Sequence, residues 1–151
     1  MIRIAAVHPD VIADERLRSG TPRFNAEWLE LFNAGGGPAD VYGYFVVNGR
    51  GEGFTIELPR RKALVLGPYQ ALLIFSGFPD NPADPAVCYL ANQATRLFLK
   101  RDSYFWDAEE DNVYLYSSRE GYAENAEGYV DYYHYKRRSA KVIIKQKSSR
   151  R

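Results

Sequence analysis

The chain contains little cysteine, methionine or histidine. Among its 151 residues are one Cys, one Met and two His. Cys88 has no second cysteine to pair with, which excludes an intrachain disulfide and the cysteine-based zinc and redox frameworks. His8 and His134 do not occur at the spacings of the common histidine zinc motifs. The sequence therefore predicts no metal and no cofactor.

Long apolar runs are also missing. No run approaches the roughly 18 residues that a membrane helix needs, and the first ten residues contain no apolar core of signal-peptide length. We therefore expect a soluble protein with no membrane association. Because its one thiol is compatible with a reducing compartment, we also expect a cytoplasmic location.

Aromatic residues are abundant, at 15% of the chain with 12 Tyr, and the apolar residues come in short runs separated by turn-forming residues. This composition favours strands over helices. About nine short strands at turn spacings of about 8 to 12 residues predict an all-β sandwich. The segments with strand character are 2–7, 27–32, 41–48, 54–58, 63–66, 69–75, 95–99, 104–106, 113–116 and 129–135.

Residues 25–33 hold the clearest strand pattern. Side chains alternate across a strand, so Glu27, Leu29 and Leu31 share one face and Trp28 shares the other with Glu30 and Phe32. We expect Leu29 and Leu31 to point into the sandwich. The odd spacing of Glu27 and Glu30 separates their carboxylates, so they cannot act as a catalytic pair.

Charge is distributed unevenly along the chain. Residues 136–151 contain eight of the 20 basic residues and no acidic residue, whereas the rest of the chain carries 12 basic and 19 acidic residues. We therefore divide the chain into a sandwich domain, 1–135, and a basic C-terminal tail, 136–151. Lysines flanking a short apolar run predict an edge strand over 141–145, and disorder is expected from Lys147 onward.

No catalytic constellation is apparent. A catalytic triad would have to combine Ser103 or Ser117 with His134 and Asp131. Neither serine lies in a nucleophile elbow, and Asp131 and His134 would face opposite sides of a strand. The glycines of 48–53 lack a following Gly-Lys-Ser or Gly-Lys-Thr and predict a hairpin turn. The acidic segment 107–112 is either a hard-cation loop or a solvated hairpin. The sequence thus predicts a protein that is not an enzyme.

Two features are candidates for binding. The first is an aromatic surface on neighbouring strands, which either contacts a partner or only pairs across the sheet; its candidate residues are Tyr114, Tyr116, Tyr132 and Tyr133. The second is the tail, which either contacts phosphates, folds back on the acidic domain or is only solvated. Its candidate nucleic-acid contacts are Lys136, Arg137, Arg138, Lys141, Lys145 and Lys147.

Several segments carry a family resemblance through their order along the chain. They are 2–9, 27–33, 40–44, 66–68 with 71–74, 111–116, and the closing Val130, Asp131 and Tyr135. In this order they resemble the lamin tail domain, in a stand-alone member of prokaryotic type. The resemblance implies an immunoglobulin-like β-sandwich with a binding or scaffolding role and no chemistry. Residues after Tyr135 lie outside the pattern.

We therefore expect a non-catalytic interaction or scaffolding module that binds another macromolecule, with protein as the first candidate. The alternative is a nucleic-acid-associated accessory protein that contacts phosphates through its basic tail. Edge strands of the sandwich also allow self-association.

Overall fold

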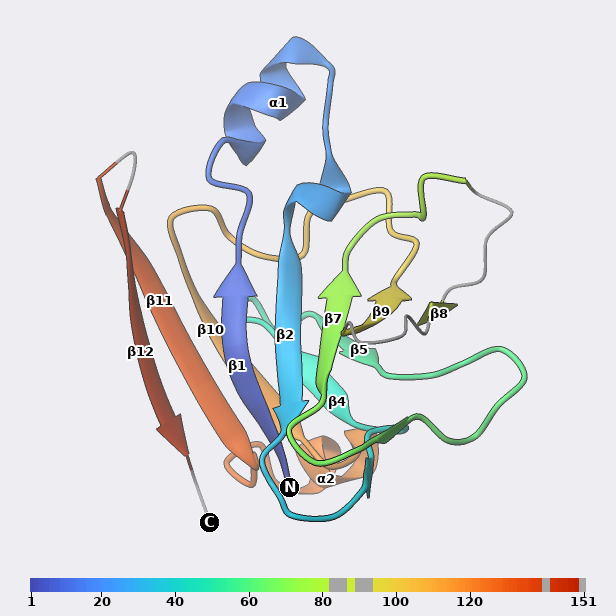
Figure 1. Cartoon of the computed structure of the whole chain (residues 1–151). Helices are drawn as coiled ribbons and strands as arrows, with labels where there is room; N and C mark the ends of the chain where they lie inside the picture. Colours follow the sequence, from blue (N-terminus) through green and yellow to red (C-terminus); the bar gives the residue numbers. More distant parts are fainter. Residues whose placement is uncertain (82–86, 89–93, 140–141, 150–151) are drawn as a thin grey trace.

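The computed structural model describes residues 1–81, 87–88, 94–139 and 142–149, which form a β-sandwich (Figure 1). The first sheet has the order β1 (Ile2–His8), β2 (Trp28–Asn33), β7 (Ala71–Phe75), β9 (Thr95–Phe98), β8 (Val87–Cys88). The second has the order β12 (Val142–Ser149), β11 (Asp131–Ser139), β10 (Glu110–Tyr116), β4 (Phe45–Val47), β5 (Gly53–Thr55). β3 (Ala39–Asp40) and β6 (Val65–Leu66) form a separate pair. The prediction of an all-β sandwich is confirmed.

The alternation predicted around β2 is present. Leu29 and Leu31 are completely buried, whereas Trp28 and Phe32 on the other face are only half-buried. β2 pairs antiparallel with both β1 and β7, and β7 then pairs parallel with β9. The strand therefore lies inside the first sheet, where both of its backbone edges are hydrogen-bonded.

The main core lies between the two sheets. The first sheet contributes aliphatic side chains, and the inward face of β10 and β11 contributes both aliphatic and aromatic ones. The main core includes Ile4, Leu29, Leu31, Leu72, Ile74, Val46, Val113, Leu115, Tyr133 and Tyr135. Phe105 and Trp106, in the loop before β10, are buried in the same cluster.

The helices are short. α1 (Ala13–Ser19) ends at Gly20, whose φ of 75° suits glycine. α2 (Arg119–Glu124) lies between β10 and β11 along the chain. The Ser118 hydroxyl caps it by accepting a 2.9 Å hydrogen bond from the Gly121 N–H. Within the described part of the chain, no helix has the length and apolarity to cross a membrane.

Residues 104–106 do not form the strand predicted there. Two of their N–H groups donate to the Glu27 side chain instead of to a neighbouring strand. Phe105 and Trp106 are nevertheless buried, with their backbone bonded to a side chain rather than to a strand.

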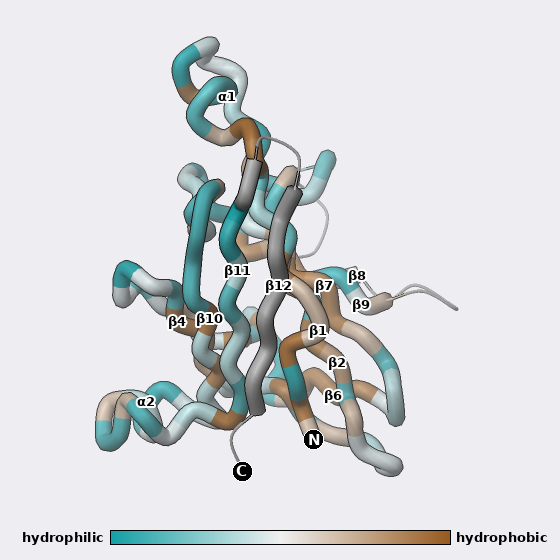
Figure 2. Tube along the Cα trace, turned by 90° about the vertical axis from the view of Figure 1, so that its left-hand side faces the viewer, coloured by the Kyte–Doolittle hydropathy of each residue, from teal (hydrophilic) through white to brown (hydrophobic). Residues whose placement is uncertain are grey.

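The basic C-terminal segment is largely part of the second sheet. β11 extends through Ser139, and β12 pairs antiparallel with it from Val142 to Ser149. The edge strand is therefore longer than the predicted 141–145, and 147–149 belong to it rather than being disordered. Figure 2 shows β11 and β10 side by side. Residues 140–141 and 150–151 lie outside the described residues.

Candidate functional site

Tyrosine side chains gather on the outer face of the second sheet. Val113 and Leu115 of β10 point into the core, so the alternating Tyr114 and Tyr116 lie on the opposite side. Tyr132 of β11 pairs directly with Tyr114. Tyr122 of α2 and Tyr129 of the following loop join them. We call this set, Tyr114, Tyr116, Tyr122, Tyr129 and Tyr132, the tyrosine face.

The rings of the tyrosine face contact one another. The centroids of Tyr114 and Tyr132 are 5.2 Å apart, and those of Tyr114 and Tyr129 are 5.5 Å apart. Tyr116 and Tyr122 meet edge to face at 5.0 Å. Such contacts stabilise a sheet by about 0.2 to 1 kcal/mol per cross-strand pair. Cross-strand pairing, one of the two predicted explanations for these tyrosines, is therefore present.

A small second core supports the tyrosine face. Phe45 and Val47 of β4 are buried beside Tyr116, which is only 3% exposed. The Tyr116 hydroxyl donates to the carbonyl of Ala126, joining β10 to the loop after α2. Burial raises the pKa of Tyr116 to about 12, so this ring is neutral at physiological pH.

Tyr133 does not belong to the predicted aromatic surface. It follows Tyr132 directly on β11 and therefore points to the other side of the sheet, where it is 3% exposed in the main core. Its assignment to a partner surface was wrong. Tyr122, which the sequence analysis did not select, lies on the face because α2 folds back over β10.

A hollow of about 580 Å³ opens at one end of the tyrosine face. Its lining consists of residues from β4, the β4–β5 turn, β10, α2 and the loop after α2: Val47, Asn48, Gly49, Gly51, Tyr114, Tyr116, Tyr122, Ala126, Glu127 and Tyr129. Among the residues that the structure describes, this lining includes one carboxylate and no Lys, Arg or His.

A polar cluster borders the tyrosine face. The Asn112 side-chain oxygen accepts a 2.6 Å hydrogen bond from the Tyr132 hydroxyl and lies 2.9 Å from His134 Nδ1. His134 Nε2 is 3.2 Å from a carboxylate oxygen of Glu110. Asp131 lies on the other side of β11, where it accepts a 2.8 Å bond from the Ile4 N–H. The candidate catalytic set of serine, His134 and Asp131 is therefore not assembled.

The structure describes the side chains of only two of the six candidate phosphate contacts. Lys136 is exposed, opposite Glu110 in the sheet. Arg137 donates to both carboxylate oxygens of Glu109 and, over 2.7 Å, to the carbonyl of Val11. The backbones of Arg138, Lys145 and Lys147 lie in β11 or β12, and Lys141 lies outside the described residues.

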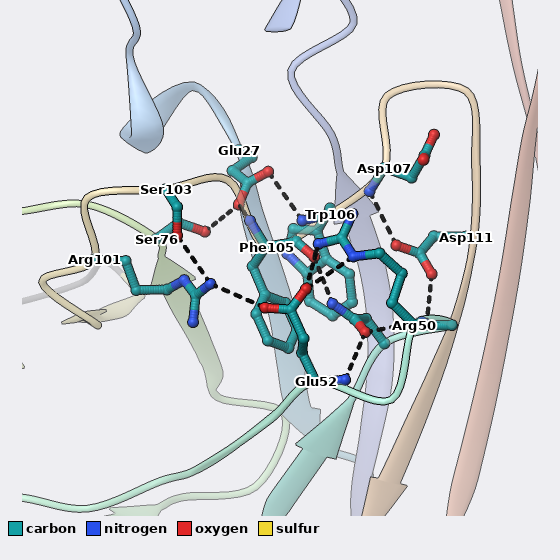
Figure 3. Close-up of polar contacts among 12 residues, drawn as sticks. Glu27, Arg50, Glu52, Ser76, Arg101, Ser103, Phe105, Trp106, Asp107 and Asp111 are labelled. Carbon is teal, nitrogen blue, oxygen red and sulfur yellow. Dashed lines mark hydrogen bonds and ion pairs between the residues drawn. The ribbon is translucent and has the colours of Figure 1, made fainter.

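A buried carboxylate, that of Glu27 directly before β2, lies against Ser76 and the loop that contains Phe105 and Trp106 (Figure 3). Glu27 is 0% exposed and accepts hydrogen bonds from the Ser76 hydroxyl at 2.5 Å, the Phe105 N–H at 2.6 Å and the Trp106 N–H at 3.2 Å. Burial raises its pKa to about 7, against the lowering effects of these bonds and of Arg101. Its donors hold the 104–106 loop across the end of the sandwich.

The Glu27 site continues through backbone groups to the β4–β5 turn. The carbonyl of Phe105 accepts from Asn48 Nδ2 at 2.7 Å and from Arg50 at 3.0 Å. Arg50 also pairs with Glu52 at 2.8 Å. Because Glu27 is completely buried and its oxygens already accept bonds from neighbouring groups, this arrangement is suited to hold the loop rather than to contact a ligand.

The acidic segment 107–112 uses its carboxylates within the fold. Asp107 accepts a 2.8 Å bond from the Glu109 N–H, and Asp111 accepts from the Gly49 N–H at 2.7 Å and the Asp107 N–H at 2.9 Å. Burial raises the pKa of Asp111, which is 4% exposed. In the described part of the chain, no three His, Cys, Asp or Glu residues are grouped to hold a metal ion.

Two sites thus differ in what they offer a ligand. The Glu27 site is closed, whereas the tyrosine face presents half-buried rings and a hollow at the surface. Comparison with known proteins adds no assignment: neither the models of known protein families nor the curated proteins include a match to this sequence.

Proposed function

We propose that this protein is a non-catalytic interaction module that binds a protein partner through the tyrosine face. One observation carries the proposal: five tyrosines from β10, α2, the loop after it and β11 are gathered on one outer face beside a hollow. Tyrosine combines large apolar area with a polar tip and few rotatable bonds, which is why it is enriched at protein interfaces.

The fold assignment within this proposal is an immunoglobulin-like sandwich of the lamin tail type. Its support is that the segments with the family resemblance include the strands β1, β2, β7, β10 and β11. Lamin-tail-like modules are expected to bind or scaffold, and the closed Glu27 site fits this role because its groups are already bonded to one another. A single cysteine supports a reducing compartment, and the proposal includes a cytoplasmic location.

The test is quantitative affinity capture from a lysate of the cells that express the protein. Tyr132→Ser removes one ring of the tyrosine face, and Tyr69→Ser removes a ring that is 76% exposed in the turn before β7. A partner that uses the face should be recovered about tenfold less with Tyr132→Ser, because central tyrosines of interfaces commonly contribute more than 1 kcal/mol. Tyr69→Ser should recover it as the unaltered protein does. If the unaltered protein, Tyr132→Ser and Tyr69→Ser recover every captured protein equally, the proposal is refuted.

A second candidate, nucleic-acid binding through the basic segment, is favoured by one observation. β12 pairs with β11 along nearly its whole length, which places the backbones of Lys145 and Lys147 at the edge of the sheet that carries the tyrosine face. Binding of a labelled oligonucleotide should then weaken in Lys145→Gln/Lys147→Gln, with a salt slope reduced by about two. An unchanged slope would remove this candidate.

Self-association through a sheet edge is a further part of the proposal. β12 and β5 are the outermost strands of the second sheet. Light scattering over a dilution series measures the molar mass at each concentration. A molar mass equal to that of one chain at every concentration would refute self-association.

A further inference from the structure

A row of aromatic rings crosses the outer face of the first sheet. The row consists of His8, Trp28, Phe75 and Phe98, which pair in this order across β1, β2, β7 and β9. The centroid of Trp28 lies 4.4 Å from that of His8 and 5.7 Å from that of Phe75, and Phe75 stacks on Phe98 at 5.3 Å. Leu29, the next residue of β2, is buried in the main core, so the row lies on the side away from the core.

This outer face is mostly apolar, although the outer face of a sandwich is commonly polar. The outward positions of β2, β7 and β9 include two charged residues, Glu30 and Arg96. The other outward positions hold Trp28, Phe32, Ala71, Leu73, Phe75 and Phe98, all partly exposed. Figure 1 shows the first sheet in front of the second, and of the described helices neither α1 nor α2 lies across β2 or β7. A continuous apolar surface of this kind indicates protein association.

The two charges on this face lie on either side of β7 at the same level. Glu30 pairs with Leu73 from β2, and Arg96 pairs with Leu73 from β9. Neighbouring strands are about 4.8 Å apart, so the two backbones are separated by roughly 9.6 Å. Among the described residues, neither side chain has an ion pair. A surface that covers this face must therefore supply a cation opposite Glu30 and an anion opposite Arg96.

A second copy of the chain supplies both charges. If two of these faces meet about a twofold axis that runs along β7, each position on β2 lies over β9 of the second copy. Glu30 then lies over Arg96 of the second copy, Trp28 lies over its Phe98, and Phe75 meets its own counterpart. An axis across the strands would instead bring Glu30 over Glu30, and like charges in an interface are unfavourable. The charges thus select one self-complementary arrangement, as a twofold dimer requires.

We propose that two copies of this chain form a twofold dimer through the outer face of the first sheet. Trp28, Phe75 and Phe98 form its apolar centre, and Glu30 and Arg96 set its orientation. This interface is separate from the sheet edges β12 and β5. The tyrosine face lies on the outer side of the second sheet, so the dimer leaves both tyrosine faces free to bind a partner. The inference goes beyond the proposed function, because it makes the interaction module bivalent.

Sedimentation equilibrium of the full chain, from about 1 μM to about 1 mM, measures the Kd of the dimer, which should be in the micromolar range. Glu30→Arg and Arg96→Glu should each raise this Kd at least about tenfold, because each places two pairs of like charges in the interface. The double variant Glu30→Arg/Arg96→Glu restores two pairs of opposite charges. Its Kd should return to within about threefold of that of the unaltered chain.

A matched control separates this effect from a general change in charge. Glu120→Arg makes the same substitution at an exposed position of α2 and should leave the Kd unchanged. The mass of one chain at every concentration, a Kd that neither charge reversal alters, or a double variant as weak as the single ones would overturn the inference. Circular dichroism verifies folding. If a charge reversal unfolds the chain, Glu30→Gln should still raise the Kd about threefold, and an unchanged Kd would count against the dimer.

The dimer and the tyrosine-face interface fail in different ways. Tyr132 lies on the second sheet, so Tyr132→Ser should not alter the Kd of the dimer. If the Kd is insensitive to both charge reversals while Tyr132→Ser still loses a captured partner, only the dimer falls. If the charge reversals and their rescue behave as expected while every captured protein is independent of Tyr132, the tyrosine-face interface falls and the dimer stands.

Discussion

The free energy of unfolding should decrease between about pH 4.5 and about pH 8 because of Glu27. Burial raises the pKa of this carboxyl from its ordinary value of 4.5 to about 7 in the folded protein. Between these values the folded state holds a proton that the unfolded state has released, so stability falls as the pH rises. The contribution is fully present below about pH 4.5 and is lost as the pH passes through about 7.

The size of the effect follows from the two pKa values. Each pKa unit corresponds to about 1.4 kcal/mol, so a change from 4.5 to about 7 corresponds to about 3 kcal/mol. A domain of this size has a total stability of roughly 5 to 15 kcal/mol, so the change is large enough to measure. Burial also raises the pKa of Asp111, so this residue adds a further loss of folding stability as the pH rises.

The Glu27→Gln variant isolates the contribution of one residue. Glutamine cannot titrate, so the variant should retain only the pH dependence of the other groups. Its amide nitrogen cannot accept the bonds that both carboxylate oxygens accept now, and one backbone donor of Phe105 or Trp106 loses its acceptor, at a cost of about 1 to 3 kcal/mol. The free energy of unfolding of the wild type minus that of the variant should therefore fall by about 3 kcal/mol from about pH 4.5 to about pH 8, and it reaches zero or changes sign.

Urea unfolding followed by tryptophan fluorescence measures these free energies at each pH. Trp28 directly follows Glu27 along the chain, and the Trp106 N–H donates to the Glu27 carboxylate. Both fluorophores therefore lie beside the residue that titrates. Glu57→Gln is the control, because Glu57 is exposed and should give the wild-type pH dependence. A wild type and a Glu27→Gln variant with parallel pH profiles would show that Glu27 does not hold a proton in the folded state at neutral pH.

Three substitutions test other parts of the fold by thermal or urea unfolding. Gly53→Ala should cost about 2 kcal/mol although Gly53 is exposed, because its new Cβ would lie 2.4 Å from Cζ of Phe45; no loss would mean that this ring moves aside freely. Asn33→Ala should cost about 3 kcal/mol, since the buried Leu66 carbonyl of β6 and two groups of the turn after β2 lose its side-chain bonds, and a loss below 1 kcal/mol would contradict this. Trp28→Ala should cost about 2 kcal/mol through its lost stacking on His8, with the recovery of a captured partner unchanged; lost recovery by the folded variant would place β2 in the interface.

Alternation along single strands was readable from the sequence. The pattern around Leu29 and Leu31 predicted which side chains of β2 enter the core, and the structure confirms it. The same rule, applied to β11, would have placed Tyr132 and Tyr133 on opposite faces. Aromatic character alone predicts one surface for both tyrosines, but adjacent strand positions face opposite sides, so the prediction for Tyr133 is wrong.

Contacts between distant segments were not readable. The strand pattern predicts that Glu27 and Glu30 face opposite sides, but the surroundings of Glu27 are Ser76 and the 104–106 backbone, about 50 and 80 residues further along the chain. Ser118 lies directly before α2 and is its N-cap, and serine is one of the residues that indicate the start of a helix in a sequence. This signal could have predicted α2, which carries Tyr122. Without α2 the sequence offered no reason to place Tyr122 beside Tyr116.

The closed site and the open hollow are connected through the β4–β5 turn. Glu27 holds the Phe105 N–H, the Phe105 carbonyl accepts the Asn48 amide, and Asn48 lines the hollow. Asp111 fixes the same turn by accepting from the Gly49 N–H at 2.7 Å. One wall of the hollow is therefore ordered before any ligand arrives, which lowers the entropy that binding must overcome. Glu27 can thus affect affinity at the hollow without contacting the ligand, by setting how rigidly Asn48 and Gly49 are held.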